Sequence, residues 1–240
     1  MTLPKPLRIV YTGYFALVFL VLGLLGLALM ALPGLELRRN IARVLGRIIL
    51  WLAGMRVRLR GVENLPYPCV IVANHASYLD GVVMAAALPP HFAFVIKNEM
   101  AGVPLAGLLL TRIGAQFVER RDRARGAMDA RRILRRASDG DALVFFPEGT
   151  FSSQRGLLRF HIGAFAIATR AKLPIVPVAI RGTRRRLPPD SALAMPGRIN
   201  IAILPPVKVP PQTTDPAAAL RDAARAALLA ELDEPDLSDE

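Results

Sequence analysis

The feature that most constrains this chain is a long stretch without charge near its N-terminus. The 27 residues between Arg8 and Glu36 carry no charged side chain, and they include the run FALVFLVLGLLGLALMALPG. As an α-helix this stretch would extend about 40 Å, enough to cross a hydrocarbon core of about 30 Å with some tilt. A cleaved signal peptide is the alternative, but the apolar region is too long and lacks a clear small-x-small cleavage site. The sequence therefore predicts a retained helical membrane anchor.

A basic segment follows the apolar run directly. It holds four arginines, Arg38, Arg39, Arg43 and Arg47. Lys5 and Arg8 precede the run, so the excess of positive charge on the downstream side is modest but favours a cytoplasmic downstream domain. Residues 41–59, IARVLGRIILWLAGMRVRL, place arginines among large apolar side chains and predict a basic amphipathic helix in the headgroup region. A shallow two-helix hairpin that never crosses the bilayer is the alternative to a spanning helix.

The charge of the whole chain indicates an anionic partner. Thirty-one basic against 19 acidic residues give a formal net charge of +12, which suits either nucleic acid or an anionic membrane surface. The stretch RRDRARGAMDARRILRR, residues 120–136, is the best candidate for nucleic acid. It reads as a helix with a solvated or membrane-facing basic side, and no recognition motif accompanies it, so we expect no nucleic-acid partner. The single cysteine, Cys69, excludes an intrachain disulfide and fits a reducing compartment.

From residue 67 onward, short apolar runs alternate with helical patterns. The predicted strands are 69–73, 92–96, 115–118, 142–146, 175–180 and 199–204, and the predicted helices are 77–87, 104–112, 124–137 and 163–171. Continuous apolar strands separated by helices predict an α/β fold, with a largely parallel or mixed sheet flanked by helices. Pro177 lies inside one of these strands and predicts an edge position or a bulge there.

The C-terminal region predicts one more helix, with Asp215 as its N-cap and Pro216 at its first position. The acidic residues 233–240, DEPDLSDE, are expected to be disordered and solvated. The predicted organisation is therefore an anchor with a basic amphipathic helix at 1–60, an α/β catalytic domain at 61–214, and a C-terminal helix with an acidic tail at 215–240.

The stretch VIVANHASYLDG, residues 70–81, places a histidine at the end of a predicted buried strand. Ligands of open α/β sheets bind beyond the carboxyl ends of strands, which is where His75 falls. Ser77 and Asp80 have the spacing of a capping box, with Asp80 at the N3 position. A carboxylate there points back to the helix start and could accept the Nδ1 proton of His75, leaving Nε2 as a base. The capping role and the catalytic role are compatible.

The residues around His75 in the sequence bear on two questions, which group is the nucleophile and whether a metal is bound. No G-x-S-x-G sequence supplies a serine, so His75 is expected to activate a hydroxyl of the substrate directly. His75, Asp80 and Glu148 form a conceivable metal set. No His-x-x-x-His or cysteine pair supports it, and no metal is expected.

Three further predicted strands end in residues suited to a binding site. GAQFVERR supplies Gly114, Phe117 and Arg120, LVFFPEGTFS supplies Glu148, Gly149 and Thr150, and IVPVAIRGT supplies Pro177. An arginine at a strand end is suited to bidentate binding of a phosphate. A glycine allows the backbone to approach a ligand closely. Polar groups at consecutive strand ends therefore predict one constructed site.

These segments also carry a resemblance. NHASYLD, GAQFVER, FPEGTFS and VPVAIRG resemble, in order, the four motifs of the glycerolipid acyltransferases, and the pattern is most similar to the bacterial 1-acylglycerol-3-phosphate acyltransferases. The resemblance implies a membrane enzyme of phospholipid biosynthesis that makes phosphatidic acid. Its acyl donor would be acyl-CoA or acyl-acyl carrier protein, its acceptor a lysophospholipid, and it would need no cofactor. It implies a place on the bacterial inner membrane, with the catalytic domain in the cytoplasm.

The resemblance also implies residue roles. His75 would be the general base and Asp80 its orienting carboxylate. Arg120 and Lys97 would bind the acceptor phosphate. Five further residues would shape the acceptor site and one would belong to the fourth motif: Gly114, Phe117, Glu148, Gly149, Thr150 and Pro177.

One position departs from the family pattern. Phe151 stands where the family commonly has arginine, which removes a cation and leaves open another lysolipid acceptor, such as a lyso-ornithine lipid. A non-catalytic lipid-binding protein is the alternative outside enzymes, because it would keep the anchor and basic surface without needing the His75–Asp80 pair. Arg184–Arg186 could dock an acidic carrier protein or anionic lipid, or could be a plain surface loop.

Overall fold

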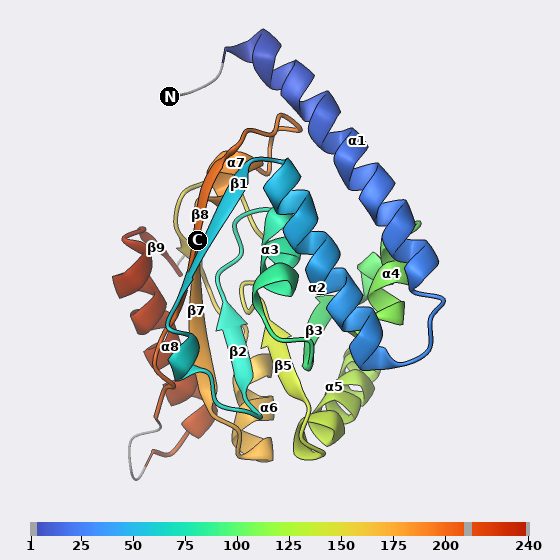
Figure 1. Cartoon of the computed structure of the whole chain (residues 1–240). Helices are drawn as coiled ribbons and strands as arrows, with labels where there is room; N and C mark the ends of the chain where they lie inside the picture. The colour runs from blue at the N-terminus through green and yellow to red at the C-terminus, as the bar shows by residue number, and fades with distance from the viewer. Residues whose placement is uncertain (1–3, 209–212, 239–240) are drawn as a thin grey trace.

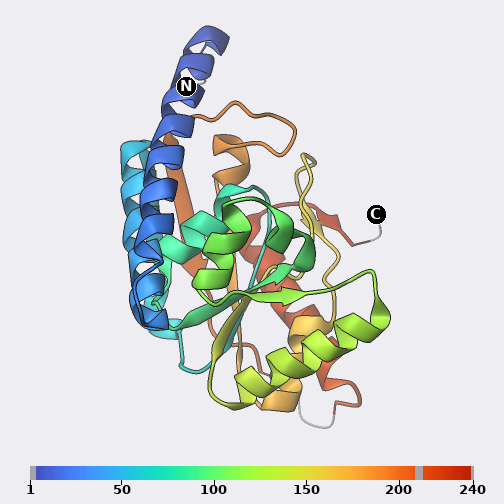
Figure 2. The same cartoon turned by 90° about the vertical axis from the view of Figure 1, so that its right-hand side faces the viewer.

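The computed structural model describes residues 4–208 and 213–238. Two long N-terminal helices, α1 (Lys5–Leu29) and α2 (Leu35–Leu52), pack against each other and lie on one side of the α/β domain (Figures 1 and 2). On length and composition alone, α1 is the one helix in the described part of the chain that could cross a membrane. Its apolar surface indicates association with a membrane.

The centre of the domain is a seven-stranded sheet in the order β1-β8-β7-β2-β5-β3-β4. The strands are β1 Met55–Arg60, β2 Val70–Ala73, β3 Phe92–Lys97, β4 Gln116–Val118, β5 Ala142–Phe145, β7 Ile175–Arg181 and β8 Gly197–Ile203. Neighbouring strands are parallel except β7 and β8, which run antiparallel. The predicted α/β class with a largely parallel or mixed sheet is confirmed, and the six predicted strands lie within two residues of their observed bounds.

Helices cover both faces of the sheet (Figure 2). One face packs against α1, α2 and α3 (Leu79–Ala87), and the other against α5 (Arg123–Ser138), α6 (Gly163–Ala171) and α8 (Pro216–Leu232). The shorter elements are η1 Val62–Asn64, η2 Asn98–Gly102, α4 Ala106–Arg112, α7 Thr183–Arg186, β6 Leu157–Leu158 and β9 Asp236–Leu237. Strand residues alternate between two apolar clusters, one on each face, so the sheet is buried on both sides as its continuous apolar runs require.

The predicted amphipathic helix over 41–59 is too long. The helix ends at Leu52, and Met55–Arg60 instead forms the edge strand β1, paired in parallel with β8. Gly54 adopts a left-handed backbone (φ 61°) that breaks the helix. Beyond it the sequence MRVRLR alternates with period two, so that Met55 and Val57 pack on the core and the arginines are exposed.

Two of the four arginines of α2 bond to other helices of the protein. Arg39 Nε donates to the carbonyl of Ile113 at 2.9 Å, and Arg47 Nε donates to the carbonyl of Ala86 at 2.8 Å. These carbonyls lie at the C-terminal ends of α4 and α3, where the helix dipole favours a cation. The outward face of α2 is apolar, with four exposed large side chains, Leu37, Val44, Ile48 and Trp51.

The edge position suggested by Pro177 is wrong, since β7 lies between β8 and β2. The β7–β8 ladder begins only at Val178, opposite Ile203. The carbonyl of Pro177 accepts a bond of 2.9 Å from the N–H of Leu204, just beyond β8. Pro177 therefore lies opposite Leu204, beyond the end of the β7–β8 ladder. The N–H that proline lacks would form no bond of that ladder.

The C-terminal helix is confirmed, with the Asp215 carboxylate accepting the N–H of Ala218 at 3.0 Å. The acidic tail is not disordered where the structure describes it. Asp236–Leu237 forms β9, which pairs in parallel with β6, and Leu237 is only 7% exposed. The prediction failed because it weighed the charge of DEPDLSDE and gave no weight to its apolar Leu237 or to a basic partner for Asp236, which Arg225 provides.

Candidate active site

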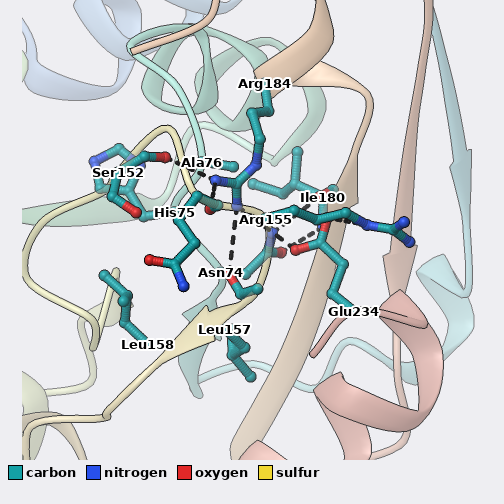
Figure 3. Close-up of polar contacts among 12 residues, drawn as sticks. Asn74, His75, Ala76, Ser152, Arg155, Leu157, Leu158, Ile180, Arg184 and Glu234 are labelled. Carbon is teal, nitrogen blue, oxygen red and sulfur yellow. Dashed lines mark hydrogen bonds and ion pairs between the residues drawn. The ribbon is translucent and has the colours of Figure 1, made fainter. Parts of the chain in front are cut away.

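The loop after β2 is fixed first by Asn74. This buried side chain makes two bonds to one residue of the neighbouring strand β7: Nδ2 donates to the carbonyl of Ile180 at 2.9 Å, and Oδ1 accepts the Ile180 N–H at 2.7 Å (Figure 3). The β2–β7 ladder ends at Val178, so the N–H and the carbonyl of Ile180 have no partner in β2. The Asn74 amide satisfies both, because it can donate and accept at once. The backbone that enters the next residue, His75, is thereby held in place.

Asp80 organises the start of α3 and the His75 ring together. Its fully buried Oδ2 accepts from the N–H of Ala76 at 2.6 Å, from the N–H of Ser77 at 2.8 Å and from His75 Nδ1 at 2.9 Å. Ser77 Oγ in turn accepts the N–H of Leu79 at 3.2 Å. The predicted His75–Asp80 contact is therefore present, together with half of the predicted capping box, the bond from the Ser77 N–H to Asp80. The reciprocal half is missing, because the helix begins at Leu79 with Tyr78 as its N-cap and Ser77 Oγ binds the N–H of Leu79 instead of that of Asp80.

The His75 ring is packed between aromatic side chains. Phe146 stacks on it with ring centres 4.4 Å apart and planes at 24°, and Phe151 meets it edge-on, also at 4.4 Å. The exposed fraction of the His75 side chain is 19%. Because Nδ1 is bonded to Asp80, Nε2 is the ring nitrogen left to exchange a proton with a ligand.

Glu148 acts on the backbone of this loop. Oε1 accepts the N–H of His75 at 2.6 Å, and Oε2 accepts the N–H of Leu158 at 2.9 Å. Burial raises the pKa of Glu148 to about 7, although the two N–H groups act in the opposite direction. Glu148 was predicted to shape the acceptor site. In the structure its carboxylate links the backbone of His75 to that of Leu158, in the segment that follows Gly149.

Arg120, which follows β4, bonds to the loop that follows β5. Its Nη1 donates to the carbonyl of Gly149 at 2.7 Å. A Cβ on Gly149 would come within 2.6 Å of that nitrogen, and the left-handed backbone of Gly149 (φ 74°) favours glycine there. Lys97 ends β3 opposite Val118 of β4, and its exposed side chain lies at the same edge of the sheet as Arg120. Lys97 and Arg120 therefore lie at the ends of neighbouring strands at the same edge of the sheet.

Other predicted site residues lie elsewhere or face solvent. Gly114 precedes β4 at its amino end, where a Cβ would come within 2.9 Å of Leu35 in α2. Phe117 pairs with Ile96 inside the sheet, Pro177 is buried in β7, and Thr150 is exposed beside Gly149. The structure therefore does not bring Gly114 to the edge that carries His75.

His161, which was not among the predicted site residues, lies beside Gly149. The same hypothetical Cβ on Gly149 would lie 3.0 Å from His161 Cδ2, so this ring and Arg120 meet at one glycine. The N–H of His161 donates to the carbonyl of Pro147 at 2.8 Å. Burial, followed by the charges of Arg120 and Arg159, lowers the pKa of His161. The available signal was a histidine directly before a predicted helix, in the segment RFHIGAF.

Arg184–Arg186 were considered as a docking site for an acidic carrier protein or anionic lipid. Two of these three arginines bond to backbone carbonyls within the protein. Arg184 Nη1 donates to the carbonyls of Ser152, at 2.7 Å, and Gln154, and Arg186 Nη1 donates to the carbonyl of Pro196 at 2.6 Å. Both guanidinium groups are thus engaged within the protein. In the part of the chain that the structure describes, no group of three or more His, Cys, Asp and Glu side chains is placed to hold a metal ion.

Comparison with known proteins bears on this geometry. A family model described as Acyltransferase matches residues 56–181. The chain is 30% identical to the 1-acyl-sn-glycerol-3-phosphate acyltransferase alpha of Mus musculus, over 90% of this chain and 79% of that protein. It is 31% identical to the protein of the same name from Homo sapiens, over 90% and 80%. The 1-acyl-sn-glycerophosphate acyltransferase from Thermotoga maritima shares the fold, with a TM-score of 0.77, 23% identity and 95% coverage of both chains.

Proposed function

The chain belongs to the acyltransferase family, and we propose that it moves a fatty acyl group from an acyl thioester to the free hydroxyl of 1-acylglycerol-3-phosphate, giving phosphatidic acid. The observation that carries the proposal is the contact of 2.9 Å between His75 Nδ1 and Asp80 Oδ2 at the carboxyl end of a buried parallel strand. A base held by a carboxylate is the arrangement that acyl transfer to a hydroxyl requires.

The reaction follows from that contact. Asp80 accepts the Nδ1 proton, so in the neutral imidazole the lone pair of Nε2 is the one that faces the acceptor. Nε2 removes the proton of the acceptor hydroxyl as its oxygen attacks the thioester carbonyl. The tetrahedral intermediate then expels the thiolate, which takes the proton back from the imidazolium. An ester bond forms, a thioester bond breaks, and His75 returns to its starting state. Acyl-CoA or acyl-acyl carrier protein is the proposed donor, and no cofactor takes part.

The acceptor phosphate is assigned to the cations around Gly149. Arg120 is held at its carbonyl, His161 lies against it, and Lys97 ends the neighbouring strand. A guanidinium offers two parallel N–H donors to phosphate oxygens, and a phosphate beside His161 favours its protonated form. In this assignment Gly149 and Thr150 border the acceptor, whereas Glu148 maintains the loop.

The membrane surface is assigned to the outer faces of α1 and α2. The first half of α1 is tied to the domain by bonds from Arg8 Nη2 to the carbonyl of Leu193, at 2.9 Å, and from the N–H of Ala194 to Thr12 Oγ1, at 3.0 Å. A helix bonded sideways to a polar domain is not surrounded by lipid, so this contact supports the hairpin that lies in one leaflet. The proposed location is the bacterial inner membrane, with the α/β domain in the cytoplasm.

A second acceptor class has one observation in its favour. Phe151, which stands where the family commonly has arginine, lies edge-on to both His75 and Tyr78, at centre distances of 4.4 Å and 4.7 Å. An apolar ring there supplies no cation for a phosphate. A lysolipid with another headgroup, such as a lyso-ornithine lipid, is therefore the second candidate.

A headgroup panel separates the two candidates. Purified full-length protein in lipid nanodiscs would be given one lysolipid at a time with acyl-CoA or acyl-acyl carrier protein, and products would be identified by mass spectrometry. Formation of phosphatidic acid that disappears with His75→Ala supports the proposal. Acylation of only a phosphate-free lysolipid would select the second candidate. Lipid binding without any acyl product would show that the chain is a lipid-binding protein.

A further inference from the structure

The last described residues of the chain meet the loop that covers His75. This active-site loop, residues 149–158, ends in β6, which pairs with β9 of the C-terminal segment, residues 234–237. The N–H of Leu157 donates to the carbonyl of Pro235 at 2.9 Å. Leu237 fits against Gly156, where a Cβ would come within 2.5 Å of its side chain. The C-terminal segment and the active-site loop are thus complementary in hydrogen bonding and in shape.

Arg225 of α8 holds both partners of this pairing. Its Nη1 donates to Asp236 Oδ2 at 2.5 Å, and its Nη2 donates to the carbonyl of Leu157 at 2.9 Å and to Asp236 Oδ1. The Arg225 side chain is only 11% exposed, whereas the Asp236 carboxylate that it binds is 47% exposed. One guanidinium therefore fixes the C-terminal segment to β6.

A second link reaches the middle of the active-site loop. Arg184 donates to the carbonyls of Ser152, Gln154 and Gly156, and it lies 3.6 Å from the carboxylate of Glu234 (Figure 3). Arg155 also approaches Glu234, at 3.9 Å. Glu234 thus supplies the negative charge beside an arginine that gathers three loop carbonyls.

Two contacts carry this restraint to the catalytic residue. Leu158 of β6 donates its N–H to Glu148, and the other oxygen of Glu148 accepts the N–H of His75. Phe151, next to the Ser152 carbonyl that Arg184 binds, rests on the His75 ring. The C-terminal segment is therefore connected both to the backbone of His75 and to its ring.

We infer that residues 234–237 and Arg225 are a positioning element of the active site: they hold the active-site loop so that Glu148 and Phe151 keep His75 in its reactive orientation. This role rests on the proposed function. A purely structural role is the alternative. Neither of the two apolar clusters formed by the described residues includes Leu237, so its contribution is local to the loop. A misplacement of about 1 Å at a catalytic group costs on the order of a hundredfold in rate.

The test uses two altered proteins, a chain that ends at Asp233 and the variant R225Q. Wild type and the variant R221Q are the controls. Arg221 is the matched control, because it lies one helical turn earlier on α8 and forms an ion pair with its exposed neighbour Asp222. We expect kcat to fall by about ten- to a hundredfold in the shortened chain and in R225Q, with the acceptor KM changed by less than about threefold and melting temperatures near wild type. R221Q should retain wild-type kcat, and R225K, which keeps the cation, should recover part of the loss.

A spectroscopic readout follows the loop without using activity. In a W51F background, which removes the single natural tryptophan, F151W places an indole against His75. Its emission should be shielded from acrylamide in the full chain and should become accessible in the shortened chain and in R225Q. If wild type makes no phosphatidic acid, the proposed function fails, while this signal still reports the loop.

Three results would overturn the inference. One is unchanged kcat in both R225Q and the shortened chain. Another is an equal loss in R221Q, and the third is an indole as shielded in the altered chains as in the full chain. If the shortened chain does not fold, R225Q and E234Q decide the matter by the same measurements.

Discussion

The backbone N–H of His75 donates to Glu148 at 2.6 Å, so the FPEGT segment holds the NHASYLD segment through its main chain. The same carboxylate accepts the N–H of Leu158. A buried carboxylate with two backbone donors fixes the distance between two loops. The proposed base, His75, is consequently oriented from two sides, by Asp80 at its ring and by Glu148 at its backbone.

Removal of the base should abolish turnover. We expect His75→Ala and Asp80→Asn to lower kcat by about two to four orders of magnitude, because the first removes the proton acceptor and the second removes the charge that holds it. Membrane association and lysolipid binding should stay near wild type. Steady-state acyl transfer and vesicle flotation measure the two properties. Retention of more than about a tenth of wild-type kcat by His75→Ala would exclude a general base there.

Glu148 should make stability depend on pH. Its folded pKa of about 7 lies above the ordinary 4.5, so its contribution to stability is fully present below pH 4.5 and is lost as the pH rises toward and through 7. The loss is on the order of 3 kcal/mol. Thermal unfolding of wild type and E148Q in detergent at several pH values measures it. E148Q should lack this decline while losing kcat, and parallel pH curves for the two proteins would contradict the assignment.

Arg120 should act on acceptor binding. Arg120→Ala removes the guanidinium at Gly149 and is expected to raise the KM for a phosphate-bearing acceptor by at least about tenfold, with a smaller change in kcat. Arg121→Ala is the matched control, because its side chain is 86% exposed and its ion pair with Glu99 lies at the surface. Equal acceptor dependence in the two variants would remove Arg120 from the phosphate role.

His161 should give acceptor binding a pH dependence. Its pKa is lowered by burial and by the charges of Arg120 and Arg159, so the free enzyme gains this positive charge only as the pH falls. The KM of wild type for a phosphate-bearing acceptor should fall as the pH is lowered through and below 6.5. The acceptor phosphate also titrates in this range, so the informative quantity is the ratio of wild-type KM to that of H161Q at each pH. A constant ratio would show that His161 does not face the phosphate.

Phe151 should set the acceptor preference. Phe151→Arg restores the cation common in the family beside His75 and is expected to raise the preference for phosphate-bearing over phosphate-free lysolipids by about tenfold in kcat/KM. Phe151→Leu is the control for lost aromatic packing. Competition between the two acceptors in one vesicle, read by mass spectrometry, measures the ratio. An equal shift in both variants would assign the effect to packing instead of charge.

Local sequence pattern accounts for most of the sheet and for the His75–Asp80 contact. Short apolar runs such as 70–73, bounded by turn and loop residues, favour buried strands, and the spacing of Ser77 and Asp80 brings Asp80 back to the start of its helix, beside His75. The pattern failed at β1, where the alternating arginines of MRVRLR continue an apparent amphipathic helix. Only the pairing with β8 decides between the two, and that pairing joins residues far apart in sequence.

The partners of single side chains were the other limit of prediction. The segment FPEGTFS marks Glu148 as a candidate site residue, because it follows a predicted strand. Its bonds to His75 and Leu158 could not be predicted, because they depend on loops that meet in space. His161 stands 11 residues beyond Thr150 and approaches Gly149 only because the loop between them folds back. The acidic tail was misjudged for the same reason, since the pocket for Leu237 is built by Gly156 of the active-site loop.

The bond from Arg47 of α2 to Ala86 ends on α3, the helix whose first turn carries Asp80. Helices α2 and α3 also pack on each other, so the proposed membrane-facing helix and the helix that carries Asp80 are directly joined. In the proposed placement on the membrane, this packing sets the distance of His75 from the lipid. We therefore expect the length of an acceptor's headgroup to affect how well its hydroxyl reaches His75.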